Sequence, residues 1–185
     1  MSFNQRAFLW VHHFMGASPW LDGFGVFLAE WLPYFLVLGF FMLLLSQPGW
    51  RKKFYWFAEG AIAIMVSRGI VTETIRLFYH YERPFSFYHF APLIVGAGWS
   101  FPSGHAAWFF AMATTIWYMD RKWGIAFYIF ALVNGISRVY VGVHWPFDIV
   151  GGIAVGILSG IVVHWLLTSS REGIYKTATP VAAQR

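Results

Sequence analysis

The sequence has no cysteine, and only 11% of its residues are charged. The lack of cysteine excludes disulfides and thiolate metal sites. Soluble domains carry about a quarter charged residues, so the shortage of charge excludes an ordinary soluble fold. Hydrophobic residues make up 58% of the chain and aromatic residues 22%, including 11 tryptophans. This composition is typical of a membrane protein with aromatic side chains at the lipid–water interface.

The formal net charge of +5 is compatible with a nucleic-acid or anionic-lipid partner. Because the basic residues lie between apolar runs, we interpret them as determinants of membrane orientation and expect no nucleic-acid partner. No cleavable signal peptide is expected, since the first apolar stretch is short and contains His12 and His13.

Five stretches are long enough to cross a bilayer, which needs roughly 20 apolar residues. They lie near residues 21–45, 54–79, 103–119, 123–140 and 146–167. Because lipid offers the backbone no hydrogen-bond partner, each is predicted to be a helix. The predicted fold is an all-α integral membrane helical bundle with five transmembrane helices, or six if hydropathy misses one span.

Other segments are predicted to lie outside the bilayer core. Residues 3–15 are expected to form an interfacial N-terminal helix, and residues 85–99 a second interfacial element. We interpret residues 1–185 as a single domain, in which residues 169–185 form a flexible cytoplasmic tail.

The basic residues fall on two sides of the predicted spans. One side holds Arg51, Lys52, Lys53, Arg121, Lys122, Arg171, Lys176 and Arg185, and the other holds Arg6, Arg76, Arg83 and Arg138. The positive-inside rule places the larger group in the cytoplasm. The three polar motifs described below then lie on the extracytoplasmic side.

Two features lie within the spans. Gly152, Gly156 and Gly160 repeat every four residues, which allows close helix packing, either within the chain, as we favour, or in a dimer. Glu30 and Arg68 lie at similar depth, ~15 Å below the extracytoplasmic helix ends at ~1.5 Å rise per residue. Since a lone charge there costs at least ~2.5–3.5 kcal/mol, we expect these two residues to pair or to reach a polar pocket. We favour a structural role for them over a catalytic one.

The first polar motif, Pro102-Ser103-Gly104-His105, opens the third predicted span. Unpaired backbone N–H groups at a helix start bind anions. Ser103 adds a hydroxyl, and Gly104 lets an oxygen approach the backbone. The alternative is an ordinary N-cap by Ser103.

The second motif joins Ser137-Arg138 to His144 and Asp148. Because Pro146 suits the first turn of a helix, the Asp148 carboxylate is within reach of one ring nitrogen of His144. It would fix the tautomer and favour positive charge on the ring, leaving the other nitrogen as a nucleophile. Arg138 offers a bidentate fork for phosphate oxygens.

The third motif places Arg76 and Arg83-Pro84 at the end of the second predicted span. Pro84 ends the helix and turns the chain. Taken alone, the two arginines would be interpreted as snorkelling at the membrane boundary.

Together the three motifs resemble the type 2 phosphatidic acid phosphatase (PAP2) superfamily of membrane phosphatases. The family pattern is a basic residue spaced before Arg-Pro, then Pro-Ser-Gly-His, then Ser-Arg with a following His and Asp, and here it spans residues 76–148. Two departures are visible. The family usually has Lys at the position of Arg76, and it commonly has six spans, the first of which is replaced here by residues 3–15.

The resemblance implies a role for each motif residue. His144 would attack phosphorus and form a phosphohistidine, Asp148 would orient and charge His144, and His105 would protonate the leaving oxygen and then activate water. The phosphate oxygens would be held by Arg76, Arg83, Ser103, Gly104 and Arg138. Phosphoryl transfer depends on such positioning and charge neutralisation, and general acid catalysis contributes roughly 10²–10⁴-fold.

Three residues are secondary candidates. Glu73 is placed to hold Arg76 by an ion pair. Tyr79 is placed to line the entrance, with interfacial anchoring as the favoured alternative, and Ser137 belongs to the Ser-Arg motif.

A metal site is the alternative for the catalytic group. His105, His144 and Asp148 form a permissible ligand set. Three arginines in the same pocket would repel a cation, so we predict no metal and no cofactor.

An outer-face pocket between helices suits a membrane lipid whose phosphate or diphosphate head enters from the leaflet. The short chain most resembles the bacterial undecaprenyl-diphosphate phosphatases of the superfamily. This resemblance implies a plasma-membrane enzyme of cell-wall synthesis with an extracytoplasmic site. The alternatives are a phosphatase of phosphatidylglycerophosphate, phosphatidate or lipid A, and, less favoured, a vanadium haloperoxidase or a non-catalytic lipid-binding or transport module. The oligomeric state is left open.

Overall fold

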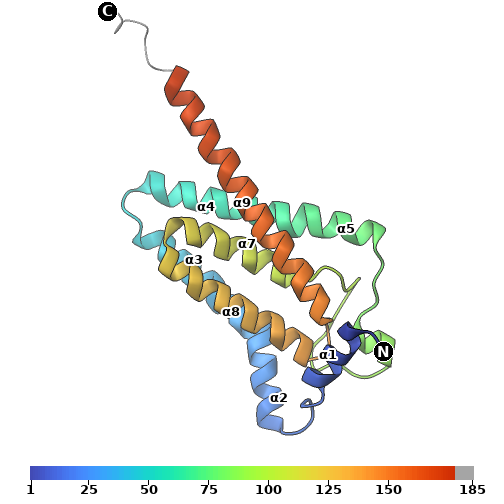
Figure 1. Ribbon diagram of the computed structural model, residues 1–185. Helices are drawn as coiled ribbons and strands as arrows, with labels where there is room; N and C mark the ends of the chain where they lie inside the picture. The colour runs from blue at the N-terminus through green and yellow to red at the C-terminus, as the bar shows by residue number, and fades with distance from the viewer. Residues whose placement is uncertain (178–185) are drawn as a thin grey trace, which may run out of the picture.

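The computed structural model describes the backbone of residues 1–177 and the side chains of residues 1–169, and this part of the chain is helical, without β-strands (Figure 1). The helices are α1 (Phe3–His12), α2 (Pro19–Val26), η1 (Phe27–Trp31), α3 (Leu32–Ser46), α4 (Trp50–Ile64), η2 (Met65–Val71), α5 (Thr72–Phe78), α6 (Pro84–Tyr88), α7 (Gly104–Met119), α8 (Arg121–Tyr140) and α9 (Pro146–Thr177). The prediction of an all-α fold is confirmed for the described residues.

All five predicted spans are helical, but they differ in how well they meet the requirements for crossing a membrane. Among the described residues, three helices are long and apolar enough: Pro19–Ser46, Arg121–Tyr140 and Pro146–Ser169. The predicted spans 54–79 and 103–119 lie in the continuous helix α4–η2–α5 and in α7. Helix α7 has 16 residues, fewer than the roughly 20 that a spanning helix needs. The long apolar helices make the chain a membrane protein.

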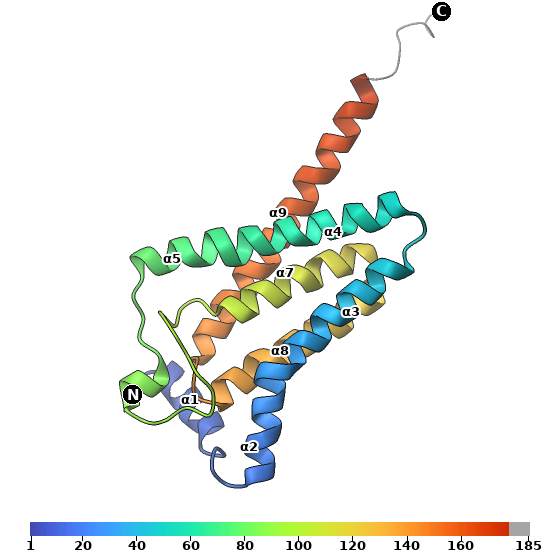
Figure 2. The same cartoon turned by 180° about the vertical axis from the view of Figure 1, so that it is seen from behind.

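Helix α7 forms the centre of the bundle. Helices α3, α4 and α8 lie alongside it, and α9 crosses it and then extends beyond the bundle (Figures 1 and 2). A helix that is apolar all round must be covered all round. Accordingly, α7 is buried over most of its length, with Phe110, Ala111, Met112 and Ile116 among its least exposed residues.

The glycine row brings α9 against the backbone of α7. A Cβ atom on Gly152 would lie 2.5 Å from the backbone oxygen of Ser103, and one on Gly156 would lie 2.6 Å from that of Ala107. A Cβ atom on Gly160 would lie 2.6 Å from the Cβ atom of the Thr114 side chain. Larger residues would therefore force the two helices apart, and the row serves packing within the chain.

Two π-helical segments interrupt the long helices, and the sequence pattern did not predict them. The first, η1, separates α2 from α3 and carries Glu30. The second, η2, separates α4 from α5 and carries Arg68. Segments of this kind occur frequently at functional sites.

Helix α1 packs beside the turn that joins α8 to α9. The Asn4 side-chain oxygen accepts a hydrogen bond from the backbone N–H of Phe147 at 3.1 Å. Phe8 is fully buried and contacts Trp145, with the two ring centroids 5.1 Å apart. A helix is thus present in the predicted segment 3–15, although it ends at His12, and it supports the start of α9.

Helix α9 continues past the predicted end of the last span. Its backbone is helical through residue 177, so residues 169–177, predicted as the start of a flexible tail, extend the helix. The rest of that predicted tail, residues 178–185, lies outside the described residues.

Candidate active site

The motif residues gather around one cavity of about 460 Å³. It is lined by Glu30, Pro33, Tyr34, Val37, Arg68, Arg76, Arg83, Val95, Gly96, Ala97, Gly104, His105, Trp108, Phe109, Arg138 and His144. Ser103 and Asp148 are fully buried beside these lining residues. Glu30 and Arg68 also line the cavity. For these two charges within the spans, the sequence predicted either a mutual ion pair or access to a polar pocket, and the second alternative is the one observed. Four arginines and two histidines therefore share one space.

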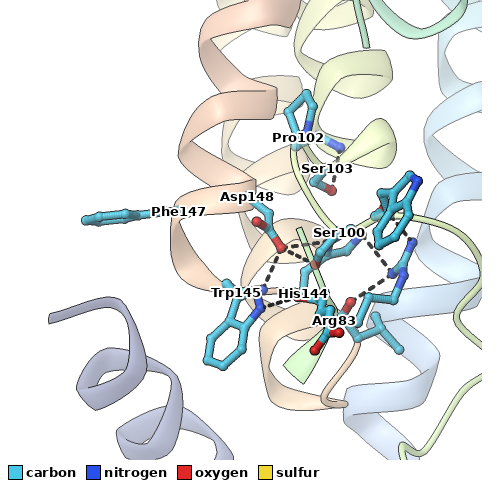
Figure 3. Close-up of polar contacts among 12 residues, drawn as sticks. Arg83, Ser100, Pro102, Ser103, His144, Trp145, Phe147 and Asp148 are labelled. Carbon is cyan, nitrogen blue, oxygen red and sulfur yellow. Dashed lines mark hydrogen bonds and ion pairs between the residues drawn. The ribbon is translucent and has the colours of Figure 1, made fainter. Parts of the chain in front are cut away.

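His144 and Asp148 form a buried pair where α9 begins. The His144 Nδ1 atom is 3.2 Å from Asp148 Oδ2, and the backbone N–H of Trp145 donates to the same oxygen at 2.8 Å (Figure 3). The other ring nitrogen, Nε2, lies 3.5 Å from Arg83 Nη1. The ring thus has one nitrogen held by a carboxylate and the other beside a cation, an arrangement that suits nucleophilic attack by Nε2.

Ser100 is a third member of this hydrogen-bonded group, and it was not predicted from the sequence. Its hydroxyl donates a hydrogen bond to Asp148 Oδ2 at 2.5 Å, and its backbone N–H donates to the Tyr81 carbonyl at 2.8 Å. Ser100 is fully buried. Its place just before Pro102 was the available signal, but a serine there suits an ordinary loop equally well.

Arg83 is clamped by backbone carbonyls. Its Nη2, Nη1 and Nε atoms donate to the oxygens of Ala97, Val143 and Gly98 at 2.7, 2.8 and 3.0 Å. The side chain thereby ties the loop after α6 to the turn before α9. Desolvation, followed by the charge of Arg76, lowers the pKa of Arg83 to about 10. Arg83 is still a cation at neutral pH and places its charge beside His144.

Arg138 and Arg76 reach the cavity from α8 and α5. The buried Arg138 donates from Nη1 to the Ala29 carbonyl at 3.2 Å. Arg76 donates from Nη2 to the Pro102 carbonyl at 2.9 Å, and its Nη1 pairs with Glu73 at 3.2 Å. The ion pair predicted between Glu73 and Arg76 is therefore present. In both arginines Nε has no hydrogen-bond partner among the described residues, so each retains a donor.

The start of α7 forms another part of the wall. The Ser103 Oγ atom accepts a hydrogen bond from the backbone N–H of Ala106 at 3.4 Å, as an N-cap does. The backbone N–H of Ser103 donates to the Asp148 backbone oxygen at 2.9 Å. The Ser103 hydroxyl therefore acts as an ordinary N-cap, which was the alternative considered from the sequence. Gly104 and His105 line the cavity.

Two secondary candidates make contacts elsewhere. Tyr79 is half-exposed, and its ring stacks on that of Tyr81 with centroids 5.7 Å apart, which agrees with interfacial anchoring. Ser137 is buried and donates to the Asn134 carbonyl at 2.7 Å, within α8. Within residues 1–169, no group of three or more His, Cys, Asp or Glu side chains is arranged to hold a metal ion.

The electrostatics of His144 differ from the sequence expectation. The sequence predicts that Asp148 favours positive charge on the ring, and this is wrong for the free protein. Burial, followed by the guanidinium groups of Arg138, Arg83 and Arg76, lowers the pKa of His144 well below its ordinary value of 6.5. The ring is therefore neutral at neutral pH, and Asp148 acts on it by orientation.

The match to known proteins decides the family. Residues 57–172 match the PAP2 superfamily. The chain belongs to this superfamily. The matched region contains every motif residue from Arg76 to Asp148, together with Arg68 on η2.

Relatives of this PAP2 protein extend over most of its length. The bacitracin transport permease protein BcrC of Bacillus licheniformis is 28% identical over 170 residues, which cover 89% of this chain and 82% of that protein. The undecaprenyl-diphosphatase BcrC of Bacillus subtilis is 31% identical over 162 residues, which cover 86% and 81%. The crystal structure of Aquifex aeolicus LpxE superposes with a TM-score of 0.72 at 25% identity, covering 88% of this chain and 95% of that one. The family and the diphosphatase relative support phosphatase activity.

Proposed function

We propose that this PAP2 protein is a metal-independent lipid phosphatase that hydrolyses undecaprenyl diphosphate to undecaprenyl phosphate through a phosphohistidine at His144. The observation that carries the proposal is the His144 ring, whose Nδ1 is held by Asp148 while Nε2 lies beside Arg83. A site that only binds phosphate needs cations but no oriented nucleophile. The resemblance to the Bacillus subtilis undecaprenyl-diphosphatase supports the choice of substrate.

In the first half-reaction, the Nε2 lone pair of His144 forms a bond to the terminal phosphorus. The bond from that phosphorus to the bridging oxygen breaks. His105, which takes up a proton when the anionic diphosphate binds, donates that proton to the bridging oxygen as undecaprenyl phosphate leaves. Arg76, Arg83 and Arg138 neutralise the equatorial oxygens. The depressed pKa of His144 serves this step, because a protonated Nε2 has no lone pair.

In the second half-reaction, His105 has lost its proton and acts as a base. It takes a proton from water, whose oxygen attacks the phosphorus of the phosphohistidine. The phosphorus–nitrogen bond breaks, inorganic phosphate leaves, and neutral His144 is restored. One histidine thus serves as acid and then as base, while the other carries the phosphoryl group.

We further infer a single domain with five transmembrane helices in the bacterial plasma membrane, with α4–η2–α5 and α7 as the two additional spans. Helix α1 lies at the interface in this arrangement. The α3–α4 and α7–α8 turns, which are followed by Arg51 and Arg121, lie at the end of the bundle away from the start of α7. By the positive-inside rule these turns face the cytoplasm, and the cavity faces the extracytoplasmic side.

The cavity has an apolar part that suits the lipid. Pro33, Tyr34, Val37, Trp108 and Phe109 contribute to its lining. A polyprenyl chain is apolar throughout, so it can leave the cavity between α3 and α7 while its diphosphate remains among the arginines.

The test is phosphate release from undecaprenyl diphosphate in detergent with EDTA, for the wild type and His144→Ala. Release that resists the chelator and disappears in the variant is expected. A phosphohistidine trapped by rapid acid-free quenching and detected by mass spectrometry on residue 144 would identify the intermediate. Equal release by His144→Ala would overturn the mechanism.

Phosphatidylglycerophosphate, phosphatidate and lipid A are alternative substrates, because the same arginines and histidines would hold any phosphate head. Release from one of these lipids but not from undecaprenyl diphosphate would retain the mechanism and replace the substrate. A transport or lipid-binding module, in contrast, would retain its function in His144→Ala, since binding requires no nucleophile.

A further inference from the structure

Arg68 is a cation of the cavity that lies outside the PAP2 motifs. It is carried by η2 and lines the same space as Arg83 and His144. Its guanidinium packs on the backbone of Gly104, where a Cβ atom would lie only 2.4 Å from Arg68 Nε. Since the next residue is His105, Arg68 lies on the side of the cavity where the leaving oxygen would receive its proton.

Arg68 differs from the other three arginines in the histidine on which it acts. Arg138 and Arg83 act on both rings, Arg76 is among the main charges that act on His144, and Arg68 is among those that act on His105. Arg138, Arg83 and Arg76 therefore surround the proposed nucleophile, where the terminal phosphate must lie. Arg68 is placed for a group on the leaving side.

The ion pair of Arg68 can be exchanged for a ligand. Arg68 Nη1 contacts Glu73 Oε1, which also pairs with Arg76 at 3.2 Å. The Arg68 and Glu73 side chains are 37% and 47% exposed, so neither is locked by burial. A phosphate offers Arg68 two oxygens in the bidentate geometry that guanidinium favours, and Glu73 can keep Arg76 as its partner.

The cavity offers one group for each part of a prenyl diphosphate. His144, Arg68 and Gly104 all line it, and Arg68 lies against Gly104. Trp108 follows Gly104 by one helical turn on the same face of α7 and also lines the cavity. The nucleophile, the additional cation and the apolar wall correspond to the terminal phosphate, the second phosphate and the lipid chain.

We propose that Arg68 binds the phosphate that stays on the lipid and so makes this site selective for diphosphates over monophosphates. The inference rests on the proposed phosphatase function. When the bridging bond breaks, negative charge develops on the departing phosphate, and a guanidinium already in place stabilises it without reorganisation. A monophosphate ester has no such group, so Arg68 contributes little to its hydrolysis.

The test compares farnesyl diphosphate with farnesyl monophosphate, which differ only by the second phosphate. In Arg68→Gln, we expect kcat/KM for the diphosphate to fall about tenfold to hundredfold and that for the monophosphate to fall less than about threefold. Arg6→Gln, which changes an exposed arginine on α1, is the matched control and should leave both substrates unchanged. Equal losses on both substrates, or no loss on the diphosphate, would overturn the inference while the wild-type activity still supports the proposed function.

A second variant separates binding from charge screening. If Arg68 only neutralises Glu73, the double variant Arg68→Gln/Glu73→Gln regains the wild-type rate on the diphosphate, and the inference is overturned. If Arg68 binds the second phosphate, the selective loss persists in the double variant. Inhibition gives an independent readout: inorganic pyrophosphate should inhibit Arg68→Gln about tenfold more weakly than the wild type, while inhibition by orthophosphate is unchanged. A wild type that hydrolyses farnesyl monophosphate but no diphosphate would overturn both the proposed substrate and the role of Arg68.

Discussion

Helix α9 takes part in two histidine–carboxylate pairs, one at its start and one near its middle. His144 Nδ1 lies 3.2 Å from Asp148 Oδ2, and His164 Nδ1 lies 3.0 Å from Glu59 Oε1. Both carboxylates are fully buried. The two pairs are therefore nearly equivalent in nitrogen–oxygen distance and in the burial of the carboxylate.

Their surroundings differ. The His164 ring stacks on Tyr118, with centroids 3.6 Å apart and an interplanar angle of 4°, and lies parallel to Trp56 at 6.4 Å. The His144 ring lines a cavity that it shares with four arginines. A buried carboxylate orients an imidazole in both places, but the His144 ring faces a cavity lined by cations, whereas the His164 ring is stacked on an aromatic ring. The chemistry therefore depends on the neighbours of the pair.

Removing each imidazole gives the largest expected contrast. His144→Ala should lower phosphatase activity by at least about 10³-fold, because a nucleophile that forms a covalent intermediate has no substitute. His164→Ala should retain activity within about threefold and instead lower the melting temperature, since it leaves the Glu59 carboxylate buried without its partner. Phosphate release and thermal unfolding in the same detergent measure both effects. Comparable loss of activity in the two variants would remove the distinction between the pairs.

Neutralising each carboxylate should give a smaller contrast. Asp148→Asn is expected to lower kcat about 10²–10⁴-fold, because the amide no longer holds the required tautomer of His144. Glu59→Gln keeps a hydrogen-bond partner for His164 and should change kcat less than about twofold. Steady-state kinetics on one lipid substrate, with circular dichroism to check folding, make the comparison. An unchanged kcat in Asp148→Asn would mean that His144 needs no orienting carboxylate.

Ser100 offers a third test of the active pair, because Asp148 accepts a hydrogen bond from its hydroxyl in addition to pairing with His144. Ser100→Ala should lower kcat about tenfold and leave KM nearly unchanged, since the bond to the charged oxygen orients Asp148 and touches no substrate. Ser67→Ala removes another fully buried hydroxyl, bonded to the Ala107 carbonyl, and serves as the matched control. A rise in KM without a change in kcat would contradict a positioning role for Ser100.

The smallest effect concerns the protonation of His144. Burial and the nearby arginines lower its pKa below 6.5, so the folded protein binds this proton less readily than the unfolded chain. Stability contributed by the neutral ring is present above about pH 6.5 and is lost as the pH falls below it. Histidine NMR in detergent micelles, assigned with His144→Ala, should show the ring neutral at pH 6.5. A signal that titrates above 6.5 would contradict the proposed electrostatics.

The helices and the motif residues that meet at one cavity were predictable from the sequence, because both signals are local. Apolar runs mark the helices, and Pro146 followed by Asp148 is enough to place a carboxylate within reach of His144. The spacing of the arginines marks residues that meet at one cavity, although their hydrogen bonds were not predictable. Arg83, for example, donates hydrogen bonds to three backbone carbonyls from two separate loops.

The rest depends on contacts between distant segments. The π-helical segments and the approach of Arg68 to Gly104 follow from helix packing, which hydropathy does not encode. Ser100 matters only because the chain brings it to Asp148, 48 residues later. The charge state of His144 was mispredicted because one local carboxylate was weighed without the burial and the three arginines that the tertiary structure supplies.

Gly152 lies at the contact between the two helices that position His105 and His144. His105 belongs to α7 and His144 to the turn that enters α9, and the two helices meet where Gly152 approaches the Ser103 carbonyl. A single methyl group at position 152 would wedge the helices apart by about 1 Å, because van der Waals contact needs roughly 3.5 Å. The proposed acid, His105, and the proposed nucleophile, His144, would then no longer reach one phosphorus atom together. A chain can therefore keep every motif residue and still lack activity, because the contact distance between α7 and α9 sets the separation of the two histidines.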